Sequence, residues 1–375
     1  MAVSRPKPEF MAEALELALG GLESVSPNPL VGAVVVRGGR VIGRGFHRGF
    51  GRPHAEREAL EAAGNARGAD LYVTLEPCAH HGKTPPCCEA VLEAGIKRVF
   101  FSASDPNPET RGKGPRLLRK AGVEVRGGLL RKEVLSQNAP YFFWRDSGRP
   151  WVVLKWAMSL DGKIATAGGE SQWITGAKAR ARGHSLRRRV DAVLVGTETV
   201  LADDPLLTPR PAGGRAPLRV ILDRRGRLPM KLKLLSHPRV AGRGRRLYVS
   251  VSGANSARRL GELERRGVET LLLPSAAAGL DLGLLLAELS KLEISQLLVE
   301  GGARLAGAFL RDALVQEIAA FVAPKIIGGE DALSPVGGEG FRKLAESLSL
   351  SDLRHEALGA DLFLSAKIRP AGSAR

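Results

Sequence analysis

The sequence contains few cysteines and few aromatic residues. Three of its 375 residues are cysteines, all in one short stretch, and aromatic side chains make up 5% of the chain. So few cysteines, placed so close together, exclude a disulfide scaffold and favour a reducing compartment. The shortage of aromatic rings leaves few side chains on which nucleic-acid bases can stack.

Long apolar runs and an excess of acidic residues are also missing. No stretch approaches the roughly 20 apolar residues that span a bilayer, and the first ten residues, MAVSRPKPEF, lack the apolar segment of a secretory signal. We therefore expect a cytoplasmic protein with no membrane partner. The formal net charge is +17, but the arginines that dominate it are spread along the chain. We expect phosphorylated small molecules as partners and no nucleic acid.

The residues that can carry chemistry gather between Pro53 and Cys88. His54 and Glu56 begin a helix-like segment, Cys78 follows a strand-like run, and Cys87 begins another helix-like segment. One imidazole and two thiolates leave a tetrahedral zinc ion with an open fourth position. A nearby carboxylate that is not a ligand can then carry the proton of an activated water. The pattern predicts three zinc ligands, with Glu56 as the catalytic acid and base.

The spacing of the cysteines leaves alternatives open. Zinc deaminases show H-x-E followed by P-C-x-x-C, whereas the second cysteine here follows in P-C-x₈-C. Cys88 is therefore an alternative to Cys87, which we favour because it directly follows Thr-Pro-Pro. A purely structural zinc site is a further alternative, and it would need a fourth protein ligand from His80, His81 or Cys88.

Strands that alternate with helices predict two α/β domains. The first half reads as a helix over 9–20, a hairpin around Gly38-Gly39, the zinc segment, and further strands and helices, the last of them a single helix around 132–144. Residues 145–150 (RDSGRP) read as a linker. A second set of strands is predicted near WVVLKWAM, DAVLVG, LRVILD, RLYVSV, SQLLVE and EIAAFV. We expect domains over 1–146 and 150–368 and a disordered tail over 369–375.

Taken together, these stretches resemble the bifunctional deaminase-reductases of riboflavin biosynthesis. The resemblance rests in the first half on PNPLVGAVVV, HAE, VTLEPCAHHGKTPPC and DPNP. In the second half it rests on LKWAMSLDGKIA, ESQWIT, DAVLVGTETVLADDPLLTPR and VEGGARLAGAFL. It implies a cytidine-deaminase-like three-layer α/β/α domain followed by a dihydrofolate-reductase-like α/β domain. It also implies a homo-oligomer formed through the second domain.

For the first domain, the resemblance implies zinc-dependent hydrolytic deamination of a phosphoribosyl-pyrimidine, with one Zn²⁺ per chain. The residues implied to contact this substrate are Asn28, His47, Lys83, Asp105 and Asn107. A turn-forming role is the alternative for Asn28 and Asp105, because both precede prolines.

For the second domain, the resemblance implies NADPH-dependent reduction of the ribose to a ribityl chain. The implied NADPH contacts are Ala157, Trp173, Thr199, Asp203, Gly302, Ala303, Arg304, Leu305, Ala306, Gly307 and Ala308. The implied substrate contacts are Lys155, Ser171, Arg187, Leu207, Arg210 and Glu300. The alternative for Arg187 is a solvated helix face, and the alternative for Trp173 is packing in the core.

Overall fold

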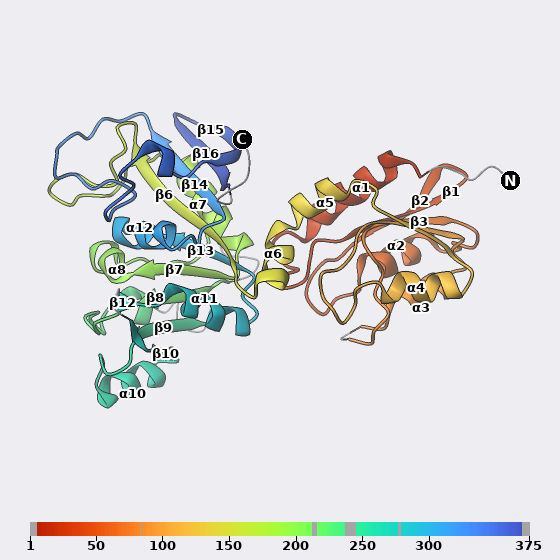
Figure 1. The fold of residues 1–375 in the computed structure, drawn as a ribbon, viewed down its shortest axis with the longest axis horizontal. Helices are drawn as coiled ribbons and strands as arrows, with labels where there is room; N and C mark the ends of the chain where they lie inside the picture. Colours follow the sequence, from red (N-terminus) through yellow and green to blue (C-terminus); the bar gives the residue numbers. More distant parts are fainter. Residues whose placement is uncertain (1–5, 83, 212–215, 237–244, 277–278, 370–375) are drawn as a thin grey trace. The chain divides into compact units, whose positions relative to one another are not determined.

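The computed structural model describes residues 6–82, 84–211, 216–236, 245–276 and 279–369. The chain divides into two compact units, Met1–Gly148 and Arg149–Arg375. Each unit has its own large sheet (Figure 1). Lys83, an expected substrate contact, and residues 370–375 of the expected disordered tail lie outside the described residues.

The first unit is a five-stranded sheet with helices on both faces. The strand order is β2-β1-β3-β4-β5; β1 is antiparallel to β2 and β3, while β3, β4 and β5 are parallel. The elements are α1 (Pro8–Ala18), η1 (Leu19–Gly21), β1 (Gly32–Arg37), β2 (Arg40–Phe46), α2 (Ala55–Ala63), β3 (Asp70–Leu75), α3 (Cys87–Glu93), β4 (Arg98–Ala103), α4 (Lys113–Lys120), β5 (Glu124–Gly127), α5 (Arg131–Gln137) and α6 (Ala139–Ser147).

Apolar side chains on both faces of strand β1 explain the three layers. Val34 and Val36 pack with Met11 of α1, whereas Val35 packs on the opposite face in a core that includes Ala59 of α2. Successive side chains of a strand point to opposite faces, so an apolar run of this kind needs cover on both sides. In Figure 1, α1 and α5 lie on one face of this sheet, and α2, α3 and α4 lie on the other.

Two local predictions for the first unit have different outcomes. The hairpin is confirmed: Gly38 and Gly39 join β1 to β2 with φ of 57° and 79°, in the left-handed region that glycine tolerates. The single helix expected around 132–144 is wrong, because it is divided into α5 and α6 at Asn138. The Asn138 side chain accepts a hydrogen bond from Leu30 N at 2.7 Å and donates one to Leu30 O at 3.0 Å.

The second unit is built on a nine-stranded mixed sheet. The order is β10-β9-β8-β7-β13-β6-β14-β16-β15, parallel from β10 to β14 and antiparallel in the last two pairings. Its strands are β6 (Trp151–Ser159), β7 (Ala192–Gly196), β8 (Leu218–Leu222), β9 (Arg246–Val251), β10 (Glu269–Leu273), β13 (Gln296–Glu300), β14 (Glu317–Ala323), β15 (Leu350–Leu358) and β16 (Asp361–Ile368). A separate pair consists of β11 (Ser275–Ala276) and β12 (Gly279–Leu280).

Helices cover this sheet too. They are α7 (Ala177–Arg189), α8 (Thr197–Asp203), α9 (Lys233–Ser236), α10 (Ala257–Arg265), α11 (Leu282–Lys291), α12 (Ala303–Arg311) and the short η2 (Leu344–Glu346). Leu285 of α11 and Phe309 of α12 pack in one core with Leu154 and Val299. The neighbouring residues Lys155 and Glu300 point to the other face, where α7 reaches them.

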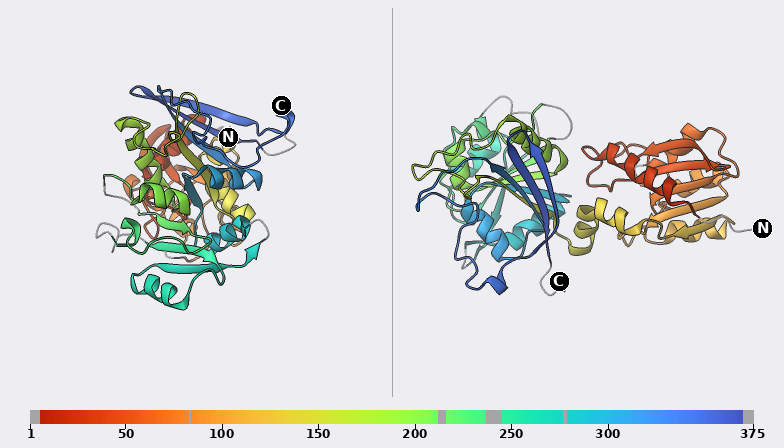
Figure 2. Two further views of the ribbon diagram at one scale, coloured as in Figure 1. Left: turned by 90° about the vertical axis from the view of Figure 1, so that its left-hand side faces the viewer. Right: turned by 90° about the horizontal axis from the view of Figure 1, so that it is seen from above.

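The C-terminal hairpin of β15 and β16 is absent from the sequence-based prediction. Figure 2 shows these dark blue strands at one edge of the sheet of the second unit. Most side chains of β15 are exposed, so this strand lacks the alternation of apolar and polar residues that marks a half-buried strand. The six strands that were predicted in this unit are all present.

Candidate active sites

Three elements of the first unit bring the predicted zinc ligands together. His54 is the residue before α2, Cys78 lies in the turn after β3, and Cys87 is the first residue of α3. Nδ1 of His54 is 3.6 Å from Sγ of Cys78 and 3.3 Å from Sγ of Cys87. In the described part of the chain these three residues form one group that could hold a metal ion, with donor atoms within 4.8 Å of one another. We call His54, Cys78 and Cys87 the zinc-ligand group. One imidazole and two thiols fit Zn²⁺ and leave its fourth position open.

The two sulfurs of this group titrate as a pair. The backbone N–H of Cys87 donates to Sγ of Cys78 at 3.3 Å. Hydrogen bonding from Cys87 lowers the pKa of Cys78 to about 4, and the bond to Cys78 together with burial raises the pKa of Cys87. A thiolate on one sulfur therefore disfavours a second thiolate beside it until a cation is present.

Cys88 points away from this group. Its sulfur donates a hydrogen bond to the carbonyl of Pro77 at 3.8 Å, and its side chain packs in the core with Val91 and Leu118. Burial raises the pKa of Cys88 to about 12, as expected of a structural thiol. His81, another candidate for a fourth ligand, is exposed and 3.2 Å from Glu89.

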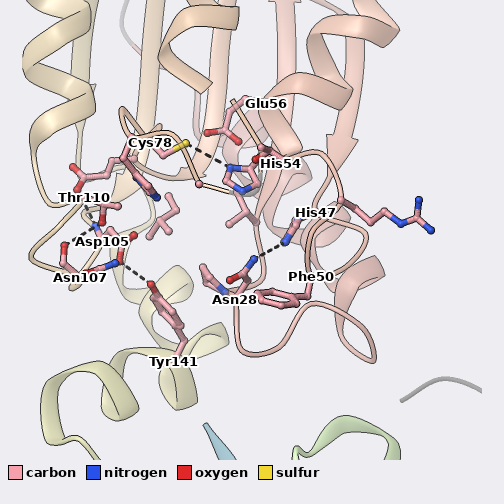
Figure 3. Close-up of a pocket in the computed structure, with 18 of the residues that line it drawn as sticks. Asn28, His47, Phe50, His54, Glu56, Cys78, Asp105, Asn107, Thr110 and Tyr141 are labelled. Atoms are coloured by element: carbon pink, nitrogen blue, oxygen red, sulfur yellow. Dashed lines mark hydrogen bonds between the residues drawn. The ribbon is translucent and has the colours of Figure 1, made fainter. Parts of the chain in front are cut away.

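Glu56 lies in the first turn of α2, beside the zinc-ligand group (Figure 3). Its side chain is 4% exposed. Burial raises the pKa of Glu56 to about 7, partly opposed by the positive charge of His54. A carboxyl group with a pKa near neutrality can accept and donate a proton under the same conditions.

A pocket of about 220 Å³ opens beside Glu56 and the zinc-ligand group. Four expected substrate contacts line it: Asn28, His47, Asp105 and Asn107. Nδ2 of Asn28 is 3.0 Å from Nε2 of His47, and Nδ1 of His47 is 3.0 Å from the carbonyl of Pro53. Figure 3 shows Asn28 and His47 on one side of the pocket and Asp105 and Asn107 on another.

Among the further residues that line this pocket, six with side chains that can contact a ligand carry no prediction from the sequence: Phe50, Arg52, Glu76, Thr110, Tyr141 and Arg145, alongside Thr84 and five apolar or glycine residues. Phe50 and Arg52 lie shortly after His47, and Glu76 lies inside the VTLEPCAHHGKTPPC stretch, so proximity to a motif is a usable signal for these three. Tyr141 and Arg145 belong to α6, far along the chain from either motif. Only the tertiary fold brings them to the pocket.

In the second unit, three expected substrate contacts form a buried charge cluster. Arg187 of α7 donates to both carboxylate oxygens of Glu300, at 2.6 and 2.8 Å, and Nζ of Lys155 lies 3.7 Å from the same carboxylate. Burial alone would raise the pKa of Glu300, but Arg187 and Lys155 outweigh it and lower the pKa to about 2. Arg187 is 17% exposed, which contradicts a solvated helix face.

The loop after α8 adjoins this cluster. The carbonyl of Thr208 accepts a hydrogen bond from Arg187 at 3.4 Å, and Leu207 beside it is 2% exposed. Burial, then Arg187 and Arg210, lower the pKa of His184 to about 4, so this histidine is neutral near pH 7. His184 was not singled out from the sequence, because a histidine on an arginine-rich helix carries no motif.

Two expected contacts pair directly at the end of α8. Oγ of Ser171 donates to a carboxylate oxygen of Asp203 at 2.9 Å. Trp173 follows closely in the same loop as Ser171, is 64% exposed, and has the guanidinium of Arg180 4.8 Å from its ring centre. The alternative that Trp173 packs in the core is therefore wrong.

The glycine turn after β13 meets α8 closely. Gly301 and Gly302 have φ of 72° and 81°, and a Cβ on Gly301 would lie 2.7 Å from the side chain of Thr199. Glycine is therefore required at this turn, and Thr199 lies beside the start of α12. Ala306 and Ala308 instead pack on the core, while Ala157 lies in β6, beyond Lys155. Of the residues expected to contact NADPH, Thr199 and Gly302 therefore lie side by side, whereas the side chain of Ala306 is buried in the core.

Comparisons with known proteins agree with both halves of this description. The family model described as "RibD C-terminal domain" matches residues 150–364, and the one described as "Cytidine and deoxycytidylate deaminase zinc-binding region" matches residues 4–103. The riboflavin biosynthesis protein RibD of Aquifex aeolicus is 42% identical over 96% of this chain and 97% of its own. That of Escherichia coli is 39% identical, over 95% and 97%.

Solved structures give the same result. Acinetobacter baumannii RibD (form 1) is 39% identical and superposes with a TM-score of 0.87, covering 97% of this chain and 99% of that one. A diaminohydroxyphosphoribosylaminopyrimidine deaminase/5-amino-6-(5-phosphoribosylamino)uracil reductase from Thermotoga maritima is 38% identical, with a TM-score of 0.83 over 96% and 98%. The fold class is confirmed: a cytidine-deaminase-like α/β unit precedes a reductase α/β unit. The chain belongs to the family of the riboflavin biosynthesis protein RibD.

Proposed function

We propose that this chain catalyses two successive steps of riboflavin biosynthesis. The first is hydrolytic deamination of 2,5-diamino-6-(5-phosphoribosylamino)pyrimidin-4(3H)-one. The second is reduction of the ribose to a ribityl chain, which gives 5-amino-6-(5-phosphoribitylamino)uracil. The observation that carries the proposal is the nearly full-length match to a deaminase/reductase, together with a zinc-ligand group and a buried glutamate at one pocket.

We assign the deamination to residues 1–146, with His54, Cys78 and Cys87 as ligands of one Zn²⁺. Zinc, when bound, supplies a Lewis acid that makes a water molecule acidic near neutral pH. Glu56 takes a proton from the attacking water, gives it to a ring nitrogen, and later protonates the departing amine. The water oxygen forms the new carbonyl while the C–N bond breaks, and ammonia leaves.

We assign Asn28, His47, Asp105 and Asn107 to substrate binding in this pocket. Their support is position: all four line the pocket that contains Glu56. Asn28 and His47 form a hydrogen-bonded pair. Together they can present a hydrogen-bond donor and an acceptor to one edge of the substrate's pyrimidine ring. Lys83 belongs to the same assignment on the strength of its motif alone.

We assign the reduction to residues 150–368, with NADPH as the cofactor. NADPH, when bound, supplies the hydride, and the chain aligns it with the opened sugar. We propose that Trp173, Thr199, Asp203, Ala157 and residues 302–308 contact the cofactor. Gly301 and Gly302 are left-handed and directly precede α12, and a glycine turn at the start of a helix suits the approach of backbone to phosphate oxygens.

We propose that the charge cluster receives the sugar of the substrate, with Lys155 as the acid or polar anchor. Glu300 carries two cationic neighbours, so its carboxylate stays ionised and can accept from sugar hydroxyls. Ser171, Leu207 and Arg210 complete the substrate contacts. We propose Arg210 as the ligand of the substrate phosphate, because a guanidinium can bind phosphate through two hydrogen bonds. Arg187 already binds Glu300 through Nε and Nη2 and positions it.

We propose a homo-oligomer formed through the second unit. Large apolar side chains are exposed on β15 and on the segment before it, including Phe341 at 52%, Leu344 at 94% and Leu353 at 67%. Large apolar side chains exposed in one part of a domain are commonly covered at a protein interface. Sedimentation of the purified chain tests this, and a monomer at micromolar concentration would contradict it.

We also propose a cytoplasmic location, because Cys78, Cys87 and Cys88 form no disulfide, as a reducing compartment favours. In the described part of the chain, no helix combines the length and apolarity that crossing a bilayer demands.

Incubation of the full chain with the diaminopyrimidine ribotide tests the proposed function. Ammonia release and NADPH consumption are followed separately. We expect ammonia to be released even when NADPH is left out. When NADPH is present, we expect its oxidation to begin only after deamination has begun. A chelator should stop ammonia release and leave reduction of the deaminated substrate intact. Loss of both activities on chelation, or reduction before deamination, would contradict the assignment of two separate sites.

A further inference from the structure

The loop between β4 and α4 carries two of the proposed substrate contacts, Asp105 and Asn107. A buried carboxylate, from the residue that follows the neighbouring strand β3, holds this loop at both ends. Oε1 of Glu76, which is 5% exposed, accepts hydrogen bonds from the backbone N–H groups of Asp105 at 3.1 Å and Gly112 at 2.8 Å. Backbone donors in a buried loop need partners, and a charged acceptor binds them more strongly than a neutral one.

The side chain of Asp105 is held from a different direction. Tyr141 of α6 is 7% exposed, lines the pocket, and donates its hydroxyl hydrogen to Oδ1 of Asp105 at 2.9 Å (Figure 3). The backbone N–H of Asn107 donates to the same oxygen at 3.0 Å. Both hydrogen bonds reach Oδ1, and Oδ2 takes part in neither. The carboxylate is therefore fixed in rotation by one of its oxygens.

Glu76 also links this loop to the zinc-ligand group. It follows β3 directly, its backbone N–H donates to Ala103 at the end of β4, and Cys78 lies two residues further along. The same turn therefore sets the position of a proposed zinc ligand and of the loop that bears Asp105. A displaced loop would move the substrate ring relative to the reacting centre, and errors of about 1 Å can cost 100-fold in rate.

We propose that Glu76 and Tyr141 are positioning residues of the deaminase site. They hold Asp105 so that its Oδ2 presents an acceptor to an N–H or O–H donor of the substrate. This inference rests on the proposed function, because the donor belongs to the amino-substituted ring or to its ribose. Neither residue touches the reacting atoms; both act through Asp105.

The test uses the full chain with Tyr141→Phe and Glu76→Gln, each of which preserves shape. We expect the KM for the diaminopyrimidine ribotide to rise about tenfold in each variant, because Tyr141→Phe removes one charge-assisted hydrogen bond and Glu76→Gln takes the charge from the acceptor of two. Zinc content and the reductase activity should equal those of the parent chain. Because both residues act through one loop, the double variant should lose less than the product of the single effects.

Matched controls separate positioning from general loss of structure. Tyr72→Phe removes another buried hydroxyl of the same unit, which accepts from the N–H of Lys7 and lies outside the pocket. Glu89→Gln removes an exposed carboxylate of α3. Both controls should leave the KM for the ribotide within twofold of the parent value. A rise in KM as large for Tyr72→Phe as for Tyr141→Phe would overturn the inference.

The decisive test repeats Tyr141→Phe in a chain in which Asp105 has already been replaced. In an Asp105→Asn chain, Tyr141→Phe should add less than about twofold to KM, because the group that it positions is already changed. An undiminished tenfold effect there, or an unchanged KM in Tyr141→Phe with full zinc, overturns the inference. If Glu76→Gln fails to fold, Tyr141→Phe still decides. Parent chain that releases no ammonia would defeat the proposed function itself, which is a distinct outcome.

Discussion

Two glutamates of this chain are almost equally buried, yet their pKa values are shifted in opposite directions. Glu56 in the first unit is 4% exposed and its pKa rises to about 7, whereas Glu300 in the second unit is 7% exposed and its pKa falls to about 2. Burial raises both values. The difference comes from the neighbours: Glu56 has a histidine and two sulfurs beside it, and Glu300 has Arg187 and Lys155.

The contrast separates a carboxyl group that can move protons from one that holds charge. A pKa near neutrality lets Glu56 exist in both forms, as an acid and base of hydrolysis requires. Glu300 remains an anion across the physiological range, so it can anchor cations and accept hydrogen bonds but cannot supply a proton. Buried carboxyl groups whose environments push their pKa values apart commonly have different roles in catalysis.

The largest effect is expected from Glu56→Gln. Glutamine keeps the shape and removes the proton exchange, so ammonia release should fall by about 10²- to 10⁴-fold. Zinc content and reduction of the deaminated substrate should stay unchanged. Glu61→Gln on the exposed side of the same helix is the matched control. Deamination that survives in Glu56→Gln at the parent rate would remove Glu56 from the reaction.

The next largest effect is expected on zinc binding, from substitution of Cys87. Cys87→Ser should lower the affinity for zinc by more than about tenfold, since a ligand is lost from the donor set. Cys88→Ser should retain zinc, because that sulfur contacts the carbonyl of Pro77 and the core. Metal analysis of both purified variants decides between them. Zinc lost in Cys88→Ser alone would reverse the assignment of the ligand.

The third prediction concerns the other buried glutamate. Glu300→Gln leaves Arg187 and Lys155 without their counter-charge, and the free energy of unfolding of the second unit should fall by about 3 kcal/mol. Its amide exchange protection reports this loss. Zinc content and ammonia release should not change. A second unit as stable as that of the parent chain would mean that the charge cluster contributes nothing to stability.

Acid provides an independent check on the same cluster. The pKa of Glu300 is depressed from 4.5 in the unfolded chain to about 2 in the folded one. Its contribution is therefore complete above pH 4.5 and is lost as the pH falls toward 2. The difference in stability between the parent chain and Glu300→Gln should shrink over that interval. A difference that stays constant down to pH 2 would contradict the cause given for the shift.

The grouping of His54, Cys78 and Cys87 could be predicted from sequence, because the chemistry of a metal site restricts the residue types within short motifs. His54 and Glu56 share one helical turn, and Cys78 and Cys87 flank a single loop. Periodicity likewise gave most of the strands, since their apolar runs pack on two faces. The choice between Cys87 and Cys88 needed the direction of each side chain, which adjacent positions in a sequence do not reveal.

The residues of the second site, and those of the first pocket that carry no prediction, could not be found from local sequence patterns. Lys155, Arg187 and Glu300 come from three separate elements, and a lysine or arginine among many carries no signature of its own. The resemblance to a family pointed to them, whereas composition and spacing did not. Tyr141 lies in the first pocket on a helix that begins just after Asn138, whose side chain binds the backbone of Leu30, 108 residues earlier in the chain. Such long-range side-chain contacts leave no local pattern.

The smallest effect is expected at a pair with almost the same geometry as Arg187 and Glu300. Arg245 donates to both oxygens of Glu269 at 2.7 and 2.6 Å, but these side chains are 53% and 44% exposed. Water screens such a pair, so Glu269→Gln should cost under about 1 kcal/mol and the cost should shrink further in salt. Amide exchange of β9 and β10 measures it. Because the two pairs share their bidentate contacts and differ in burial, equal losses for Glu269→Gln and Glu300→Gln would show that burial does not set the strength of the cluster.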